Sequence, residues 1–199
     1  MKSTLAKVLY VAGVATFCTF LGCWAVLAHQ AAEKAAGKTV SDEQFAKKAA
    51  QGGMAEVKLG QLAQEKGANE AVKKFGQRMV QDHSKAYDEL KQAAAKENIT
   101  VPADLDRKDQ AAYDAFSKLS GAAFDKAYAR DMVKDHQEDI AEFKREANSG
   151  QKDAIKNFAA ETLPTLQEHL KEAREMRQAV TSSGFTKTKA GSSAHAGQR

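Results

Sequence analysis

The segment Met79-Val80-Gln81-Asp82-His83 recurs later in the chain as Met132-Val133-Lys134-Asp135-His136. An aromatic residue precedes each methionine by four positions, Phe75 in the first copy and Tyr128 in the second. Because residues four apart share one face of an α-helix, each copy aligns an aromatic, a methionine and a histidine on a single face. The repeat therefore predicts two long helices that present the same kind of inward-facing side chains.

Apolar residues at alternating spacings of three and four extend this pattern to four long helices. We expect them at about residues 41–67, 69–97, 122–147 and 151–180, with a short amphipathic segment ending near Leu119. Two prolines, an alanine-rich composition and 28% charged residues fit an all-α protein. Pro164, inside the last helix, is expected to kink it or to free a nearby carbonyl group.

The lengths of the connections predict how these helices are arranged. The first and last connections are short, so each joins an antiparallel hairpin. The middle connection spans about 25 residues, which is enough chain to return along the bundle before the third helix begins. Two hairpins joined by one long crossover form a ferritin-like four-helix bundle.

The N-terminal residues 1–28 predict a signal peptide or membrane anchor. Lys2 and Lys7 precede an apolar run over residues 8–28, and Ala28 ends a small-x-Ala cleavage pattern. Three alternatives stay open: cleavage, retention as a membrane helix, and lipidation at Cys23. All three place residues 41–180 outside the cytoplasm, because positive charge precedes the apolar segment. Residues 29–40 are predicted to be a linker, and residues 181–199 a disordered tail.

The charge balance of the chain argues against nucleic-acid binding. The formal net charge is +4, and without Lys2 and Lys7 the balance is 28 basic against 26 acidic residues, or +2. Nucleic-acid binding usually requires a clustered basic face, and no such cluster is present in the sequence. Contact with a membrane is expected only through the N-terminal segment. The sequence identifies no protein partner and fits either a monomer or a homodimer.

Three histidines and one glutamate lie on the predicted inward faces of the four long helices: Glu56, His83, His136 and His169. His83 and His136 each lie 14 residues after the start of their helices, at Asn69 and Ala122, so parallel helices bring them to one level. Counting from the turns places Glu56 and His169 in a neighbouring layer, offset by roughly 7.5 Å.

This group predicts a metal site in the interior of the bundle, and with it a metal-binding envelope or stress protein. Imidazole suits copper, zinc and iron, and a thioether neighbour favours copper. Asp82, Asp135 and Glu168 directly precede the histidines and point about 100° away from them, which favours a supporting role over direct ligation. The predicted site comprises the ligands Glu56, His83, His136 and His169, the soft neighbours Met79 and Met132, and the supporting acids Asp82, Asp135 and Glu168.

The alternative is a metal-free structural or interaction module of the cell envelope. Buried histidines often belong to hydrogen-bonded polar networks, and methionines on helix faces are ordinarily packing residues. No nucleophile elbow, P-loop, dinucleotide-binding glycine pattern or Cys-x-x-Cys pair occurs in the sequence. An enzymatic role is therefore disfavoured.

Several elements of the chain together form a specific motif set: Phe45…Ala49…Gly53-x-x-Glu56-Val57-x-Leu59-Gly60-x-Leu62-Ala63, Met79-Val80-x-Asp82-His83, Phe124-Asp125-x-x-Tyr128, Met132-Val133-x-Asp135-His136 and Leu163-Pro164-x-Leu166-x-x-His169-Leu170. This set, over about residues 41–178, resembles domain of unknown function 4142, a family of exported bacterial proteins with a ferritin-like bundle. The resemblance implies the fold and export to the periplasm or cell envelope of a bacterium, with a membrane anchor if residues 8–28 are retained, but no activity.

The sequence departs from true ferritins at their di-iron ligands. Those sites use Glu-x-x-His pairs, whereas the residues three before the histidines here are Val80, Val133 and Leu166. A carboxylate-bridged di-iron centre therefore lacks its ligands, and ferroxidase activity is not expected.

Overall fold

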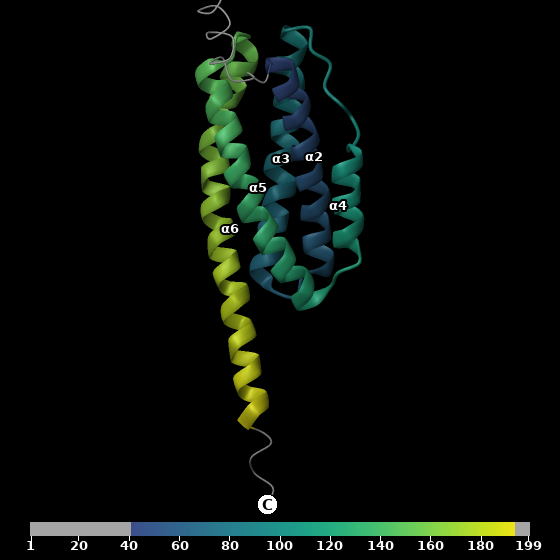
Figure 1. Cartoon of the computed structure of the whole chain (residues 1–199), viewed down its shortest axis with the longest axis vertical. Helices are drawn as coiled ribbons and strands as arrows, with labels where there is room; N and C mark the ends of the chain where they lie inside the picture. Colours follow the sequence, from purple (N-terminus) through teal and green to yellow (C-terminus); the bar gives the residue numbers. More distant parts are fainter. Residues whose placement is uncertain (1–40, 194–199) are drawn as a thin grey trace, which may run out of the picture. The chain divides into compact units, whose positions relative to one another are not determined.

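The computed structural model describes the backbone of residues 41–193 and the side chains of residues 41–182 (Figure 1). Within this range the protein is all-α, as predicted, with five helices and no strand. The helices are α2 (Asp42–Lys66), α3 (Glu70–Lys96), α4 (Arg107–Ser117), α5 (Gly121–Ser149) and α6 (Asp153–Ser193). No helix in the described part of the chain is long and apolar enough to cross a membrane.

Local capping residues explain where the first two helices begin. Ser41 accepts a hydrogen bond from the backbone N–H of Gln44, whose side chain in turn accepts from the backbone N–H of Ser41. This capping box satisfies two backbone donors that a helix start leaves unpaired. Asn69 caps α3 by accepting from the backbone N–H of Ala71.

The long helices pack as two pairs, α2 with α3 and α5 with α6, and each pair is joined by a short turn (Figure 1). A buried aspartate of each pair holds the turn of the other. Asp125, on α5, accepts hydrogen bonds of 3.0 Å from the backbone N–H groups of Ala68 and Asn69. Asp42, at the start of α2, accepts from the backbone N–H groups of Gln151, at 2.8 Å, and Lys152. The two pairs are thereby tied together at both ends.

The segment between α3 and α5 runs back along the side of α2 and carries α4 (Figure 1). Tyr113 and Phe116 of α4 pack against the hydrophobic core together with Leu119, which follows the helix. This connection therefore contributes its own helix and apolar side chains to the packing of α2 and α5. Asp106, Lys108 and Asp109, at the start of α4, lie near the candidate site described below.

The core consists of two hydrophobic clusters with a polar layer between them. One cluster contains Leu59, Val72, Tyr128, Met132 and Met176 among others, and the second contains Phe45, Leu90, Ile140, Phe158 and Leu166 among others. On each of the four long helices, one buried polar residue falls between the segments that contribute to the two clusters: Glu56, His83, His136 and His169.

The last helix is longer than the sequence predicted. We expected it to end near Val180 and residues 181–199 to form a disordered tail, but α6 continues to Ser193. Extending a helix that is already formed adds one hydrogen bond per residue without the cost of a new nucleus, so weak helix formers can follow it. The helix also runs through Pro164. The predicted signal or anchor (1–28), the linker (29–40) and residues 194–199 lie outside the described residues.

Candidate metal centre

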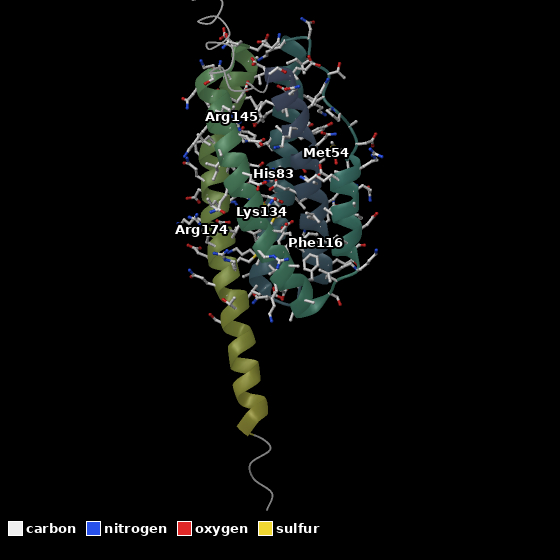
Figure 2. The ribbon with its side chains drawn as sticks, viewed as in Figure 1. Met54, His83, Phe116, Lys134, Arg145 and Arg174 are labelled. Carbon is white, nitrogen blue, oxygen red and sulfur yellow. The ribbon has the colours of Figure 1, made fainter. Side chains whose placement is uncertain are left out.

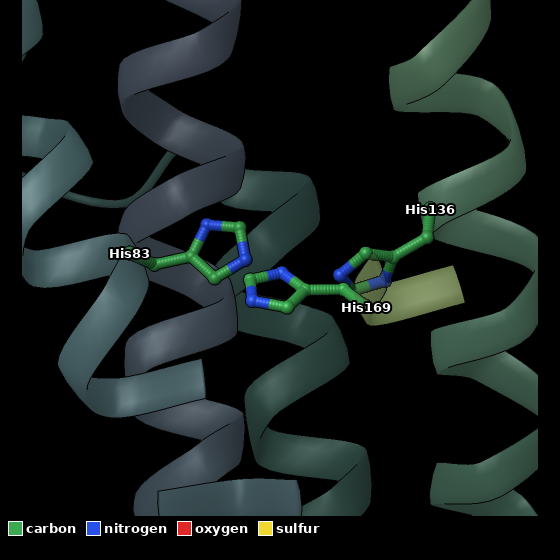
Figure 3. Close-up of side chains that lie close together, drawn as sticks. All are labelled: His83, His136 and His169. Atoms are coloured by element: carbon green, nitrogen blue, oxygen red, sulfur yellow. The ribbon is translucent and has the colours of Figure 1, made fainter. Parts of the chain in front are cut away.

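The three core histidines come from three different helices and converge. His83 lies on α3, His136 on α5 and His169 on α6, and Figure 3 shows their rings turned towards one another. One ring nitrogen from each lies within 4.8 Å of those of the other two. The ring centroids are 5.3–5.8 Å apart, and the side chains are buried. Figure 2 shows His83 about midway along the packed helices.

The ring nitrogens Nδ1 of His83 and His136 are held by acceptors. His83 Nδ1 lies 3.0 Å from the Glu56 carboxylate, and His136 Nδ1 lies 2.9 Å from the backbone carbonyl of Met132. A carbonyl only accepts, so His136 carries its proton on Nδ1. When Glu56 is ionised it only accepts, so His83 then carries its proton on Nδ1. These contacts leave Nε2 of both rings as the nitrogen with a free lone pair.

His169 is held through its other nitrogen. Its Nε2 donates to Asp82 Oδ2 at 2.8 Å, and Asp82 also accepts from Arg78 Nε at 3.1 Å. Arg78 continues to Glu172, one turn beyond His169 on α6. Burial opposes ionisation of Asp82, but the hydrogen bonds from His169 and Arg78 outweigh it and lower the pKa of Asp82. An ionised, anchored carboxylate therefore fixes the ring and leaves Nδ1 with the lone pair.

The inner nitrogens of the three rings lack hydrogen-bond partners. His83 Nε2, His136 Nε2 and His169 Nδ1 are all buried, and none has a partner among the described residues. A buried polar atom without a partner is costly, and native structures contain few of them. Three such atoms on converging side chains form a set of neutral nitrogen donors suited to a cation.

Burial also keeps these histidines neutral. It is the largest cause of the lowered pKa of each ring, well below the ordinary value for His83 and to about 4 for His136. For His169, burial lowers the pKa although its hydrogen bond to Asp82 opposes the shift. A metal ligand must offer a lone pair, and all three imidazoles therefore hold theirs at neutral pH.

Glu56 is the buried carboxyl group beside the histidines. Its side chain is 4% exposed, and burial raises its pKa well above the ordinary range, with Asp139, Asp135 and Asp131 adding to the shift. Its Oε1 lies 3.5 Å from His136 Nδ1, but that nitrogen donates to Met132, so Oε1 has no donor among the described residues. A nearby cation would stabilise the ionised form of this carboxyl group.

A cavity of about 170 Å³ adjoins the centre, and Glu56, His83 and His169 lie in its wall. Acidic side chains of α5 line it further out, among them Asp135 and Asp139. Burial, followed by repulsion between neighbouring carboxylates, raises the pKa of Asp135 to about 6 and that of Asp139 to about 7. The side of the centre that faces this cavity is therefore lined by closely spaced carboxyl groups, whose mutual repulsion a cation would relieve.

The structure differs from the sequence-based layering of the site. We expected His169 and Glu56 to form a layer apart from His83 and His136, yet His169 joins both histidines and Glu56 contacts His83. Counting residues gives only the position of each Cα along the helix axis. An imidazole or carboxylate side chain can extend several ångströms along that axis, so groups whose Cα atoms are one turn apart can still meet.

The other predicted residues are placed in different ways. Asp82 supports His169 rather than its own neighbour His83, and Asp135 lines the cavity. Glu168 is exposed and lies 3.9 Å from Arg78. Met79 and Met132 are fully buried in one of the hydrophobic clusters, and the backbone carbonyl of Met132 holds His136.

Sequence reasoning missed two participants, Arg78 and Asp139. Arg78 lies four residues before Asp82, so a helix places the two side chains in contact. This i, i+4 spacing in the sequence could have predicted the ion pair. Asp139 follows Asp135 at the same spacing, which marks an acidic row along α5.

Comparison with known proteins identifies a protein family. Searches of curated proteins and of solved structures found no match to this chain. The profile of a protein family described as a domain of unknown function, DUF4142, matches residues 27–176. That range covers the first four described helices, the three histidines and Glu56, and exceeds half of the chain. The chain therefore belongs to the DUF4142 family, a domain of unknown function.

Proposed function

We propose that this protein binds one transition-metal ion through His83, His136 and His169. The observation that carries the proposal is the pairing within each ring: the outer nitrogen is held by an acceptor, and the inner nitrogen is buried without a partner. Metal-binding histidines almost always donate their second nitrogen to a carboxylate or a backbone carbonyl, which fixes the tautomer and the ring orientation. Glu56, Met132 and Asp82 supply these acceptors.

The separation of the nitrogens fits one ion after a small movement. Three nitrogens at about 2.0–2.1 Å from a tetrahedral ion lie about 3.3 Å from each other. The nitrogens here lie within 4.8 Å, so the rings need to close by at most about 1.5 Å. Rotation about the side-chain bonds supplies such a movement without a change in the helices.

The donor set favours zinc, copper or iron. Neutral imidazole suits these ions, whereas calcium and magnesium prefer oxygen ligands. The described residues offer three imidazoles and the Glu56 carboxylate. Three histidines leave a further position on the ion, and the adjoining cavity lies on the side of His83 and His169. This arrangement suits an ion that exchanges a ligand with solvent.

We further propose that the fold is a ferritin-like four-helix bundle with a different metal centre. The two helix pairs and the long connection that carries α4 support this topology. Val80, Val133 and Leu166 occupy the positions at which di-iron proteins carry glutamates. A mononuclear histidine site within the same kind of bundle accounts for both observations.

Export of the protein to the periplasm or cell envelope is also a proposal. Its support is the sequence of residues 1–28, in which two lysines precede an apolar run. Metal binding outside the cytoplasm would suit a protein of the envelope stress response.

The test is the metal content of the full chain, measured by mass spectrometry after purification without an affinity tag. We expect about one equivalent of zinc, copper or iron, and its loss when His83→Ala and His136→Ala are combined. His195→Ala, at a histidine near the C-terminus, is the matched control and should keep the metal. Added metal should raise the melting temperature of the wild type and of the control but not of the double variant.

A folded wild-type protein that contains no metal, and whose melting temperature does not respond to added zinc, copper or iron, would overturn the proposal. The histidines and Glu56 would then be a polar layer that fixes the register of the helices.

A further inference from the structure

The cavity beside the histidines opens towards the surface on one side of the bundle. Its inner wall includes the buried residues Glu56, His83 and His169. Its exposed lining residues come from α2, α4 and α5, namely Lys48, Lys108 and Glu138. The cavity therefore reaches from the surface near the start of α4 to the unpartnered nitrogens.

Small residues of α2 create this space. Ala49, Gly52 and Gly53 form part of the wall, and a Cβ atom placed on Gly52 would meet no atom within 4 Å. Glycine in a helix interior lowers helix stability by about 1 kcal/mol relative to alanine. None of the described helices packs closely against Gly52 to compensate for that cost. The effect of the missing side chain is to leave open space in the cavity.

The wall of the cavity is strongly acidic. Its outer part carries six carboxylates: Asp106, Asp109, Asp135, Glu138, Asp139 and Glu142. Two cations, Lys48 and Lys108, face them, and Lys48 forms an ion pair with Glu142. Clefts lined by one sign of charge concentrate ions of the opposite sign and raise their association rates by about 10- to 1,000-fold.

A second observation, at the inner end of this acidic passage, points to a ligand. Glu56 is 4% exposed and lines the inner end of the cavity, and its Oε1 has no partner among the described residues. His83 Nε2 and His169 Nδ1, from two more residues of the wall, are equally without partners. An acidic cluster on a surface is common, but here it continues inward to three buried, unsatisfied polar atoms.

We propose that this cavity is the access route by which a divalent cation reaches the three histidines, with Glu56 as the last oxygen contact before them. This inference rests on the proposed metal-binding function. The outer carboxylates attract the hydrated ion, and Glu56 replaces part of its water shell at the inner end. The small side chains of α2 leave the width that the ion requires.

The experiment follows the uptake of Co²⁺ by the metal-free full chain in a stopped-flow spectrometer. Co²⁺ has a visible absorption that changes when nitrogen ligands replace water. Gly52→Leu places a branched side chain in the cavity, and Gly52→Ala is its matched control. We expect Gly52→Leu to slow uptake at least tenfold while equilibrium binding stays at one ion per chain. Gly52→Ala should match the wild-type rate.

A second arm tests the acidic lining. At pH 8, above the pKa of about 7 of Asp139, Glu138→Gln combined with Asp139→Asn removes two charges from the cavity wall. Glu161→Gln combined with Glu175→Gln removes two exposed charges of α6 that lie outside the cavity. We expect the first pair to slow uptake at least threefold and to weaken its dependence on salt, because fewer charges steer the ion. The second pair should behave like the wild type.

The outcomes separate the two proposals. If Gly52→Leu takes up Co²⁺ at the wild-type rate, the access route is wrong and the metal site stands. If both charge pairs change the rate equally, the cavity carboxylates have no special role and the route is again wrong. If the wild type binds neither Co²⁺ nor zinc, copper or iron at equilibrium, both the site and the route are overturned.

Discussion

Asp82 Oδ2 lies 2.8 Å from Nε2 of His169, although these residues are 87 positions apart and lie on different helices. The histidine is 1% exposed, whereas the aspartate is partly open to solvent and paired with Arg78. The Asp82 carboxylate therefore links the partly exposed Arg78 side chain to the buried His169 ring. This hydrogen bond fixes which nitrogen of His169 faces the other two histidines.

Asp82→Asn should weaken metal binding without unfolding the protein. An amide can still contact the ring, but it no longer provides a charge that favours the proton on Nε2, and loss of such a partner typically lowers metal affinity about 10- to 100-fold. The measurement is a competition titration of Zn²⁺ with a chromophoric chelator. Glu168→Gln, at an exposed acid that also lies near Arg78, is the control and should bind like the wild type. Equal affinities for both variants would contradict the role assigned to Asp82.

Glu56→Gln should stabilise the metal-free protein but have little or no stabilising effect on the metal-bound protein. In the metal-free protein, the neutral amide removes a buried charge and should stabilise the fold by about 1 kcal/mol. With Zn²⁺ bound, the loss of the negative charge beside His83 should reduce or abolish that gain. The check is urea denaturation of the wild type and the variant in chelator and in excess Zn²⁺. A variant that is destabilised to the same extent in both conditions would show that Glu56 acts only through packing.

Two glycines of α2 should respond to alanine in opposite ways. A Cβ at Gly60 would lie 2.6 Å from the backbone oxygen of Gly76 on α3, so Gly60→Ala should push the helices apart and cost about 1–3 kcal/mol. Gly52→Ala meets no atom within 4 Å and should stabilise the protein by up to about 1 kcal/mol. Urea denaturation midpoints of the two variants give the comparison. Stabilisation by both substitutions would contradict the close approach of α2 and α3 at Gly60.

Glu146→Gln should stabilise the protein at pH 8 and have less effect at pH 5. Burial, with a further contribution from Asp42, raises the pKa of Glu146 from 4.5 to about 7, although Arg145 opposes the shift. The native state therefore binds the proton more tightly than the unfolded chain does. Stability is lost as the pH rises from about 4.5 to about 7, and the full penalty applies above that range.

The amide variant carries no such penalty, so its gain at pH 8 should be about 1–2 kcal/mol and should fade below pH 5. Urea denaturation across this pH range, with Glu175→Gln on the exposed face of α6 as control, measures the difference. A gain that is independent of pH would show that the charge of Glu146 is not the cause.

The periodicity of the sequence predicts the helices and the inward faces well. The stripe that contains Phe75, Met79 and His83 is buried, and so is the stripe of Tyr128, Met132 and His136. These predictions succeed because an α-helix fixes which residues share a face, whatever the neighbouring helix is. The same rule picked Glu56 and His169 as inward-facing residues.

Periodicity is less informative about contacts between helices. The partner of Asp82 is on α6, and its identity depends on the packing of α3 against that helix and on a side-chain rotamer. The grouping of His169 with the other histidines likewise depends on how far an imidazole reaches along the helix axis. Neither quantity is encoded in the spacing of apolar residues, since helix crossings and rotamers are set by the whole core.

The exchange of turn contacts between Asp42 and Asp125 makes the two hairpins dependent on each other for folding. The carboxylate that accepts hydrogen bonds from the turn of one hairpin always comes from the other hairpin. A hairpin on its own therefore lacks the acceptor for its turn. A fragment that contains only α2 and α3 would leave the N–H groups of Ala68 and Asn69 without their acceptor. Unfolding of one half therefore removes a stabilising contact from the other. For a site whose ligands come from both halves, this mutual dependence means that the halves assemble together, and that the three histidines meet only in the completed fold.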